Sequence, residues 1–262
     1  MSKFIDKLNR LTRSEPQPIG FRAKQPDLPK PKIQLIASLA QEHAESLAGK
    51  VTGADAGLLR IFNPGKGAET MQKLCQDIPD MLWGGWLQNG GQDAIEQMNK
   101  AGCDFFVFPA AGTPLAIIEN AREGSILEID SSISEGLLRA SNELPVDAVL
   151  IAAEQKEGRT LTWQNLMLFQ HFARLLTKPM LVCIPAKITG SELKELWEAG
   201  VTGVVLEVGV EDPQDNVKQL RQMIDKVEFP VTRRRDRSGT SLLSGSVRER
   251  RVTAIESGEE EE

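Results

Sequence analysis

The 262-residue chain has little of what histidine-based or tyrosine-based sites need. It contains no tyrosine and two histidines, His43 and His171. Both histidines fall inside helical patterns rather than at the ends of predicted strands. We therefore expect neither histidine base catalysis nor a zinc site, because both need imidazole groups gathered at one place. No Walker or dinucleotide fingerprint is present, and we expect no haem, zinc or dinucleotide cofactor.

Paired cysteines, long apolar runs and excess positive charge are also missing. The three cysteines, Cys75, Cys103 and Cys183, form no C-x-x-C pair, which favours reduced thiols in the cytoplasm. The first residues lack the apolar core of a secretory signal, and no apolar run approaches the roughly 18 residues that span a bilayer. The net charge of −6 gives no general attraction to nucleic acid. These absences predict a cytoplasmic protein with no transmembrane segment and no nucleic-acid partner.

What is present is an alternation of short apolar strands and amphipathic helices, repeated eight times between Ile33 and Val227. Such alternation predicts βαβ units and a parallel sheet. Eight units close into a (β/α)8 TIM barrel, and an open doubly wound sheet is the alternative. The predicted strands are Ile33–Leu39, Gly57–Phe62, Met81–Gln88, Asp104–Pro109, Ser125–Asp130, Ala148–Ala153, Met180–Ala186 and Gly203–Val208.

Segments of different character flank the predicted barrel, which divides the chain into residues 1–32, 33–228 and 229–262. Residues 2–13 predict an amphipathic helix, which a proline-rich connector follows. This helix either contacts a membrane surface or a partner, or caps the bottom of the barrel. Its apolar face carries Phe4, Ile5, Leu8 and Leu11. The C-terminal segment, rich in charge, serine and glycine, predicts a disordered tail that acts as an interaction arm or a solubilising extension.

Side chains alternate along a strand, so the apolar positions show which residues face the barrel interior. Helices cover the outside of a barrel, and the regularly spaced apolar residues are therefore assigned to the outer face. This assignment sends the polar residues near the strand ends into the mouth of the barrel. The inward charged set is Arg60, Glu128, Asp130, Glu154, Lys187 and Glu207, with Gln88 beside it. The set is net negative, and burying it requires ion pairs, a ligand or shifted pKa values.

Four interpretations fit this charged mouth, three of them catalytic or metal-binding and one purely structural. Lys187 could form a Schiff base with Glu128 or Glu154 as proton shuttle, although neighbouring carboxylates favour the charged, unreactive lysine. Glu128, Asp130 and Glu207 could hold a magnesium ion, which prefers oxygen ligands. The set could also be a closed salt-bridge network with no catalytic role. The fourth reading is acid–base chemistry without metal or imine.

A glycine-containing loop follows the second predicted strand. Gly65, Lys66 and Gly67 precede a helix predicted over Glu69–Gln76. Glycines before a helix let backbone N–H groups converge on an anion, and Lys66 would add positive charge. Tight turns between a strand and a helix also use glycine for backbone reasons alone, so an ordinary turn is the alternative.

Residues 185–209 read PAKITGSELKELWEAGVTGVVLEVG. The run Ala-Gly-x-x-Gly-Val-Val at 199–205 resembles the last two units of the aldolase-type, ribulose-phosphate-binding TIM barrels. The resemblance implies a TIM barrel and, in that family, a phosphate site in the last two loops. Here Lys187 stands at the start of the loop where the family has a Gly-Gly pair. Glu211 and Asp212 follow the last strand, where they would repel a phosphate. The resemblance therefore implies the fold without the family's phosphate site or its phosphorylated substrates.

We expect a lyase, aldolase or isomerase that acts on a small polar, carboxylate-bearing substrate at the mouth of the barrel. The expected catalytic groups are Lys187, Glu128 and Glu154. The expected substrate-binding residues are Arg60, Gln88, Asp130 and Glu207, with Arg60 as the anchor for the carboxylate. The alternative is a barrel without catalytic function, which serves as a binding or assembly module through its terminal segments.

Overall fold

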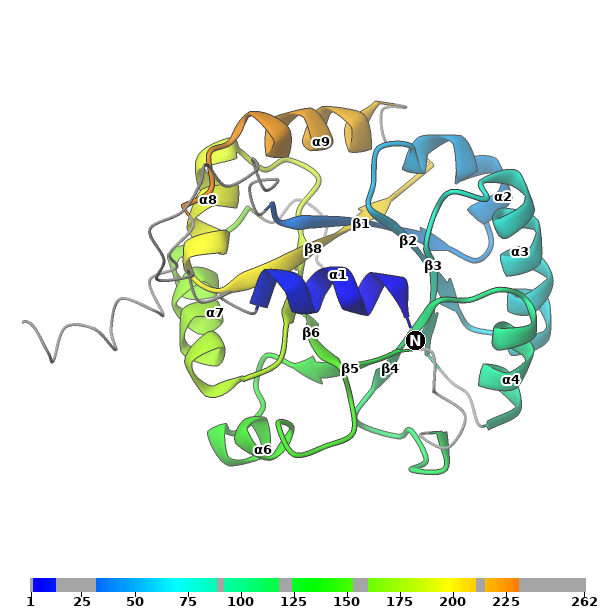
Figure 1. Ribbon diagram of the computed structural model, residues 1–262, viewed down its shortest axis with the longest axis horizontal. Coiled ribbons are helices and arrows are strands. Elements are labelled where there is room, and N and C mark those ends of the chain that lie inside the picture. Colours follow the sequence, from blue (N-terminus) through cyan, green and yellow to red (C-terminus); the bar gives the residue numbers. More distant parts are fainter. Residues whose placement is uncertain are drawn as a thin grey trace, which may run out of the picture.

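Eight parallel strands close into a barrel, each hydrogen-bonded to the next and β8 to β1 (Figure 1). The computed structural model describes residues 2–12, 32–88, 92–117, 124–152, 160–210 and 215–230. The strands are β1 (Gln34–Ala40), β2 (Ala56–Ile61), β3 (Trp83–Leu87), β4 (Phe105–Pro109), β5 (Ser125–Asp130), β6 (Ala148–Ala152), β7 (Met180–Ile184) and β8 (Val201–Val208). Closure excludes the open doubly wound sheet, and the predicted TIM-barrel fold is confirmed.

The described helices that follow the strands lie on the outside of the barrel (Figure 1). They are α2 (Ala44–Leu47), the 3-10 helix η1 (Ala48–Val51), α3 (Pro64–Asp77), α4 (Gln92–Lys100), α6 (Glu135–Ala140), α7 (Trp163–Leu175), α8 (Gly190–Glu198) and α9 (Asn216–Lys226). Capping boxes at Thr162 and Thr189 fix where α7 and α8 begin, because each threonine accepts a backbone N–H of the first turn. Because a helix joins one parallel strand to the next, it begins on the side of the barrel where the preceding strand ends.

The apolar core has two parts, one between the strands and the surrounding helices and one inside the barrel. On β5, Leu127 and Ile129 pack outward against the helices, whereas Ile126 lies in the interior. Both faces of the strands are buried, which explains why their sequences read as nearly continuous apolar runs. The alternation also leaves Glu128 on the inner face, at the end of the strand where the barrel opens.

Helix α1 (Lys3–Thr12) lies across the N-terminal end of the barrel (Figure 1). Its Phe4, Ile5 and Leu8 side chains are buried among the interior residues of the strands. The Phe4 ring stacks on Phe105 of β4, with ring centroids 4.6 Å apart. The predicted N-terminal helix thus caps the bottom of the barrel. The alternative expectation, contact with a membrane or a partner through this apolar face, is not supported, because Phe4, Ile5 and Leu8 are buried against the barrel.

The carboxylate of Asp104, the residue just before β4, caps the N-terminus of α1. It accepts hydrogen bonds from Ser2 Oγ at 2.8 Å, from the backbone N–H of Lys3 at 3.0 Å and from that of Phe4 at 2.9 Å. The first N–H groups of a helix have no partner within the helix, and the helix dipole favours a negative charge beside them. Asp104 therefore ties α1 to the start of β4.

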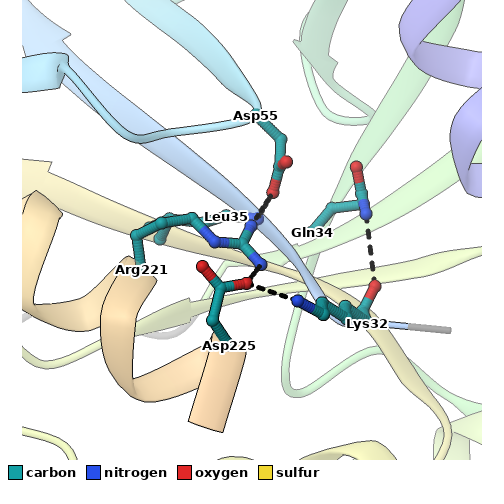
Figure 2. Close-up of polar contacts among 6 residues, drawn as sticks. All are labelled: Lys32, Gln34, Leu35, Asp55, Arg221 and Asp225. Carbon is teal, nitrogen blue, oxygen red and sulfur yellow. Dashed lines mark hydrogen bonds and ion pairs between the residues drawn. The ribbon is translucent and has the colours of Figure 1, made fainter. Parts of the chain in front are cut away.

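Ionic contacts join α9 to the starts of β1 and β2 (Figure 2). Arg221 donates to Asp55 Oδ2 at 2.8 Å and to Asp225 Oδ1 at 2.7 Å. Lys32 Nζ donates to the same Asp225 oxygen at 2.6 Å, and Asp55 also accepts the backbone N–H of Leu35 at 2.8 Å. Hydrogen bonds from Arg221 and Lys32 lower the pKa of Asp225 to about 2. These contacts hold the last helix against the first two strands.

Beyond α9, Phe229 and Pro230 contact helix α8 on the outside of the barrel. Phe229 is buried and its ring lies 5.4 Å from that of Trp197 on α8, while Trp197 Nε1 donates to the carbonyl of Pro230 at 2.9 Å. The remainder of the predicted tail, residues 231–262, and residues 13–31 of the predicted connector lie outside the described residues. Of the helices that are described, none has the length and apolar character needed to cross a membrane.

Candidate active site

Four inward-facing side chains form a chain of contacts at the C-terminal end of the barrel. They are Glu207 on β8, Arg60 on β2, Trp86 on β3 and Glu128 on β5. Arg60 and Trp86 are direct neighbours in the β2–β3 register, so their side chains extend from the same level of the sheet. The structure thus brings together three of the charged residues that strand alternation predicts at the mouth, Arg60, Glu128 and Glu207.

The guanidinium of Arg60 has contacts on two sides. Its Nη1 donates to Glu207 Oε1 at 3.2 Å, and its Cζ lies 4.6 Å from the centroid of the Trp86 ring. A guanidinium over an indole face is a cation–π contact, worth roughly 0.5–2 kcal/mol depending on how far it is desolvated. The Nε of Arg60 is buried and finds no hydrogen-bond partner in the described part of the chain. Arg60 therefore has donor capacity that the ion pair does not use.

Glu128 is half-buried, and its carboxyl is held by an indole. Trp86 Nε1 donates to Glu128 Oε2 at 2.6 Å. Burial raises the pKa of Glu128 above its ordinary value, while the hydrogen bond from Trp86 and the charge of Arg60 offset part of that rise. Glu128 therefore holds a proton more readily than a carboxyl in water does. A carboxyl tuned in this way is suited to exchange a proton with a bound molecule.

The other predicted site residues do not join this chain of contacts. Asp130 is exposed and accepts the backbone N–H of Ser132 at 2.7 Å, and hydrogen bonds from the side chain and backbone of Ser132 lower the pKa of Asp130. Lys187, three residues past the end of β7, is exposed. Gln88 lies one residue beyond β3 and is partly buried. Glu154 falls outside the described residues.

Within the described ranges, no group of three or more His, Cys, Asp or Glu side chains could hold a metal ion. The expected magnesium ligands contact three different donors: Glu128 an indole N–H, Asp130 a backbone N–H and Glu207 a guanidinium. The expected three-carboxylate magnesium site is therefore not assembled. The physical reason is that Arg60 supplies to Glu207 the positive charge that an ion would bring, and Asp130 turns to its own loop.

The predicted anion loop forms the first turn of α3, which begins five residues earlier than the sequence indicates. Asn63 accepts the backbone N–H of Lys66 at 3.4 Å, and the N–H of Gly67 donates to the Asn63 carbonyl at 2.8 Å. A Cβ on Gly67 would lie 2.7 Å from Ile61 Cγ2, so the packing of α3 on β2 requires this glycine. The cap and the helix thus use two of the amides that an anion at Gly65, Lys66 and Gly67 would need.

Two uncharged residues, Trp86 and Ser38, also lie at the mouth of the barrel, although the charge pattern of the strand ends does not indicate them. Trp86 links Arg60 to Glu128, as described above. Ser38 on β1 lies in register with Glu207, is 1% exposed, and its hydroxyl has no hydrogen-bond partner among the described residues. Alternation along the strand places both side chains inward, but nothing in the sequence distinguishes them from other interior residues.

Comparison with known proteins supports the fold and assigns no family. A scan against protein-family models and a search of curated protein sequences find no match. Solved structures do resemble the chain. A mutant tryptophan synthase alpha-subunit from the hyperthermophile Pyrococcus furiosus is 12% identical, with a TM-score of 0.60, covering 75% of this chain and 98% of that one.

Two further structures show the same likeness. Thiamine phosphate pyrophosphorylase from Pyrococcus furiosus is 17% identical, with a TM-score of 0.54, covering 74% of this chain and 96% of that one. A protein described as native KDPGal is 16% identical, with a TM-score of 0.56, covering 79% and 97%. At these identities the likeness concerns the fold alone, and it agrees with the closed barrel of eight parallel strands.

Proposed function

We propose that this barrel is an acid–base enzyme of the lyase or isomerase type, acting on a small polar substrate that carries a carboxylate. Glu128 transfers the proton, and Arg60 binds the carboxylate. The observation that carries the proposal is the partly desolvated Glu128 carboxyl with its raised pKa, at the end of the barrel where enzymes of this fold place their chemistry. A synthase subunit and a pyrophosphorylase are among the similar structures, in keeping with catalysis on such a barrel.

Arg60 suits a carboxylate because a guanidinium binds that group through two parallel N–H···O bonds. In the free protein, Glu207 contacts it through one nitrogen at 3.2 Å. The side chains of Arg60 and Glu207 are 23% and 40% exposed, so the pair is open to solvent. A substrate carboxylate can therefore exchange with Glu207 at the guanidinium.

Proton transfer without an imine fits the mouth better than a Schiff base does. A reactive lysine needs a dry pocket or a neighbouring cation, and Lys187 is exposed. Burial instead raises the pKa of Glu128. In the proposed step, ionised Glu128 removes a proton from a C–H next to a carbonyl or carboxyl group of the substrate. The resulting Glu128 carboxylic acid returns the proton to a neighbouring atom.

A binding module without catalysis is the second candidate. The observation in its favour is that Arg60 and Glu207 already neutralise each other. A closed network of this kind can stabilise a barrel without taking part in a reaction. Proton exchange with a bound substrate separates the two candidates, because a closed network exchanges no substrate protons.

The direct test is proton exchange, which requires no knowledge of the product. The full chain is incubated in D2O with a panel of small oxo- and hydroxy-carboxylates, and the loss of their C–H signals is followed by NMR. We expect exchange with the wild-type protein and a decrease of about 100-fold in Glu128→Gln, because general acid–base groups contribute on that order. Arg60→Met should weaken binding of the exchanging compound, as a raised half-saturation concentration.

The matched control is Glu42→Gln, which removes an exposed carboxylate in the loop after β1. It should keep the wild-type exchange rate. Equal rates in Glu128→Gln and the wild type, or no exchange with any member of the panel, would rule out Glu128 as the proton-transfer group.

A further inference from the structure

The mouth contains two buried polar groups that the proposed function leaves unused. Ser38 Oγ and Arg60 Nε are both buried, and neither has a hydrogen-bond partner in the ranges that the structure describes. A buried donor without a partner is unfavourable, and proteins keep few of them. Such groups therefore indicate that a ligand forms hydrogen bonds with them when it is bound.

The strand register places the two residues on neighbouring strands, two positions apart along the inner face. Ser38 on β1 is level with Glu207 on β8 and with Leu58 on β2, and Arg60 is two residues further along β2. Because Arg60 and Glu207 flank β1 on its two sides, their ion pair extends across the inner face of β1 beside Ser38. The pair therefore accounts for a serine that is 1% exposed although it lies near the open end of the barrel.

The other buried serines differ from Ser38. Ser2 Oγ donates to Asp104, Ser125 Oγ contacts Asp147, and Ser141 Oγ donates to the carbonyl of Leu138 at 2.7 Å. Each of those hydroxyls has a structural partner. Ser38 has none in the described chain, which argues against a purely structural role for its hydroxyl.

We propose that Ser38 determines substrate specificity, an inference that rests on the proposed function. When a substrate carboxylate replaces Glu207 on Arg60, Ser38 Oγ and Arg60 Nε bind a second substrate oxygen, on the carbon next to the carboxylate. The substrate class is thus a 2-hydroxy- or 2-oxo-carboxylate rather than a simple carboxylate. Glu207, which is already partly exposed, moves into solvent as the substrate binds.

The experiment compares ligands that differ by one oxygen. Dissociation constants for propanoate, 2-hydroxypropanoate and 2-oxopropanoate are measured by calorimetry with the full-length wild-type protein and with Ser38→Ala. We expect the wild type to bind an oxygenated ligand about tenfold more tightly than propanoate, the ratio that one good hydrogen bond gives. In Ser38→Ala the ratio should fall severalfold, because only Arg60 Nε still donates to the second oxygen, while the affinity for propanoate stays unchanged.

Ser141→Ala is the matched control, because it removes a buried serine hydroxyl far from the mouth that already has a partner. It should lower Tm and keep the wild-type ligand ratio. Ser38→Ala should keep or raise Tm, because it removes a hydroxyl without a partner.

The outcomes distinguish this inference from the proposed function. If the wild type prefers oxygenated ligands and Ser38→Ala retains that preference, the role of Ser38 is wrong and the proposed function stands. Equal affinity of the wild type for all three ligands overturns the inference in the same way. A clear loss of Tm in Ser38→Ala shows a structural hydroxyl and also overturns it. If none of the three carboxylates binds to the wild type, both the inference and the carboxylate anchor at Arg60 are wrong.

Discussion

Glu128 shows how one partly buried carboxyl connects chemistry to stability. Burial disfavours its charged form, and the hydrogen bond from Trp86 and the charge of Arg60 offset only part of that effect. The same imbalance that makes the group useful for proton transfer should make the fold sensitive to pH.

The first prediction concerns this sensitivity. The folded-state pKa of Glu128 lies above its value of 4.5 in an unfolded chain, so its stabilising contribution is complete below that pH. The contribution is lost as pH rises through the folded-state pKa. Glu128→Gln cannot ionise and still offers Trp86 an acceptor. We therefore expect the variant to gain stability relative to the wild type as pH rises above about 4.5, measured by urea unfolding. A relative loss over that range contradicts the raised pKa.

At the scale of elements, helix α1 is an addition to the eight strand–helix units of the barrel. Its Phe4, Ile5 and Leu8 side chains fill the interior that the bottom of the strands leaves open. Asp104 then fixes the start of the helix through three hydrogen bonds. The apolar face of a ten-residue segment is thus part of the core of the whole barrel.

The second prediction tests that role. Phe4 is fully buried and stacks on Phe105, so Phe4→Ala should lower the free energy of unfolding by about 3–5 kcal/mol. Lys7→Ala, on the exposed face of the same helix, is the control and should change stability by less than about 0.5 kcal/mol. Urea unfolding of both variants measures the difference. Equal stability of the two variants would mean that α1 does not contribute to the folded barrel.

Element boundaries show what sequence alone could predict. β5 spans Ser125–Asp130 as predicted, because strand ends there coincide with a change from apolar to polar residues. α3 begins at Pro64 rather than near Glu69, because Asn63 caps it and proline fits the first helical position. Gly65 and Gly67 suggested a loop, yet the second is needed for close packing against Ile61. That requirement depends on a neighbouring strand and has no local sequence signal.

At the scale of the whole molecule, the barrel is closed by contacts between segments distant in the chain. Arg221 and Asp225 of α9 pair with Asp55 and Lys32 at the other end of the sequence (Figure 2). The β1–β8 pairing does the same for the strands. Loss of either set should affect the molecule as a unit rather than one helix.

The third prediction follows from the low pKa of Asp225. That pKa is about 2 in the fold against 3.8 in an unfolded chain, so its stabilising contribution is present above about pH 4. It is lost as pH falls from about 4 to about 2. The side chain is 45% exposed, so solvent screening limits the effect to about 1 kcal/mol or less. Asp225→Asn should unfold more easily than the wild type at pH 7, with the difference vanishing near pH 2. A difference that persists unchanged at pH 2 rules out the charge as its cause.

The candidate site could be predicted only in part. Alternation along the strands correctly placed Arg60, Glu128 and Glu207 together, because the parity of a strand is a local property. The contact between Trp86 and Glu128 passes over β4 and depends on the curvature of the closed barrel. Asp130 and Lys187 lie at or beyond the last residue of their strands, where parity no longer fixes direction.

The position of α1 has a further consequence for the order of folding. The helix precedes all eight strands in the chain, yet its capping residue, Asp104, follows Ser2 by 102 positions. Its seat also includes residues of β7 and β8, such as Leu181 and Val205. The helix therefore finds its final partners only after β7 and β8 have been synthesised, because these partners lie far later in the sequence. Seating of α1 marks the completion of the barrel, and an amide-exchange probe on Phe4 would time that last step.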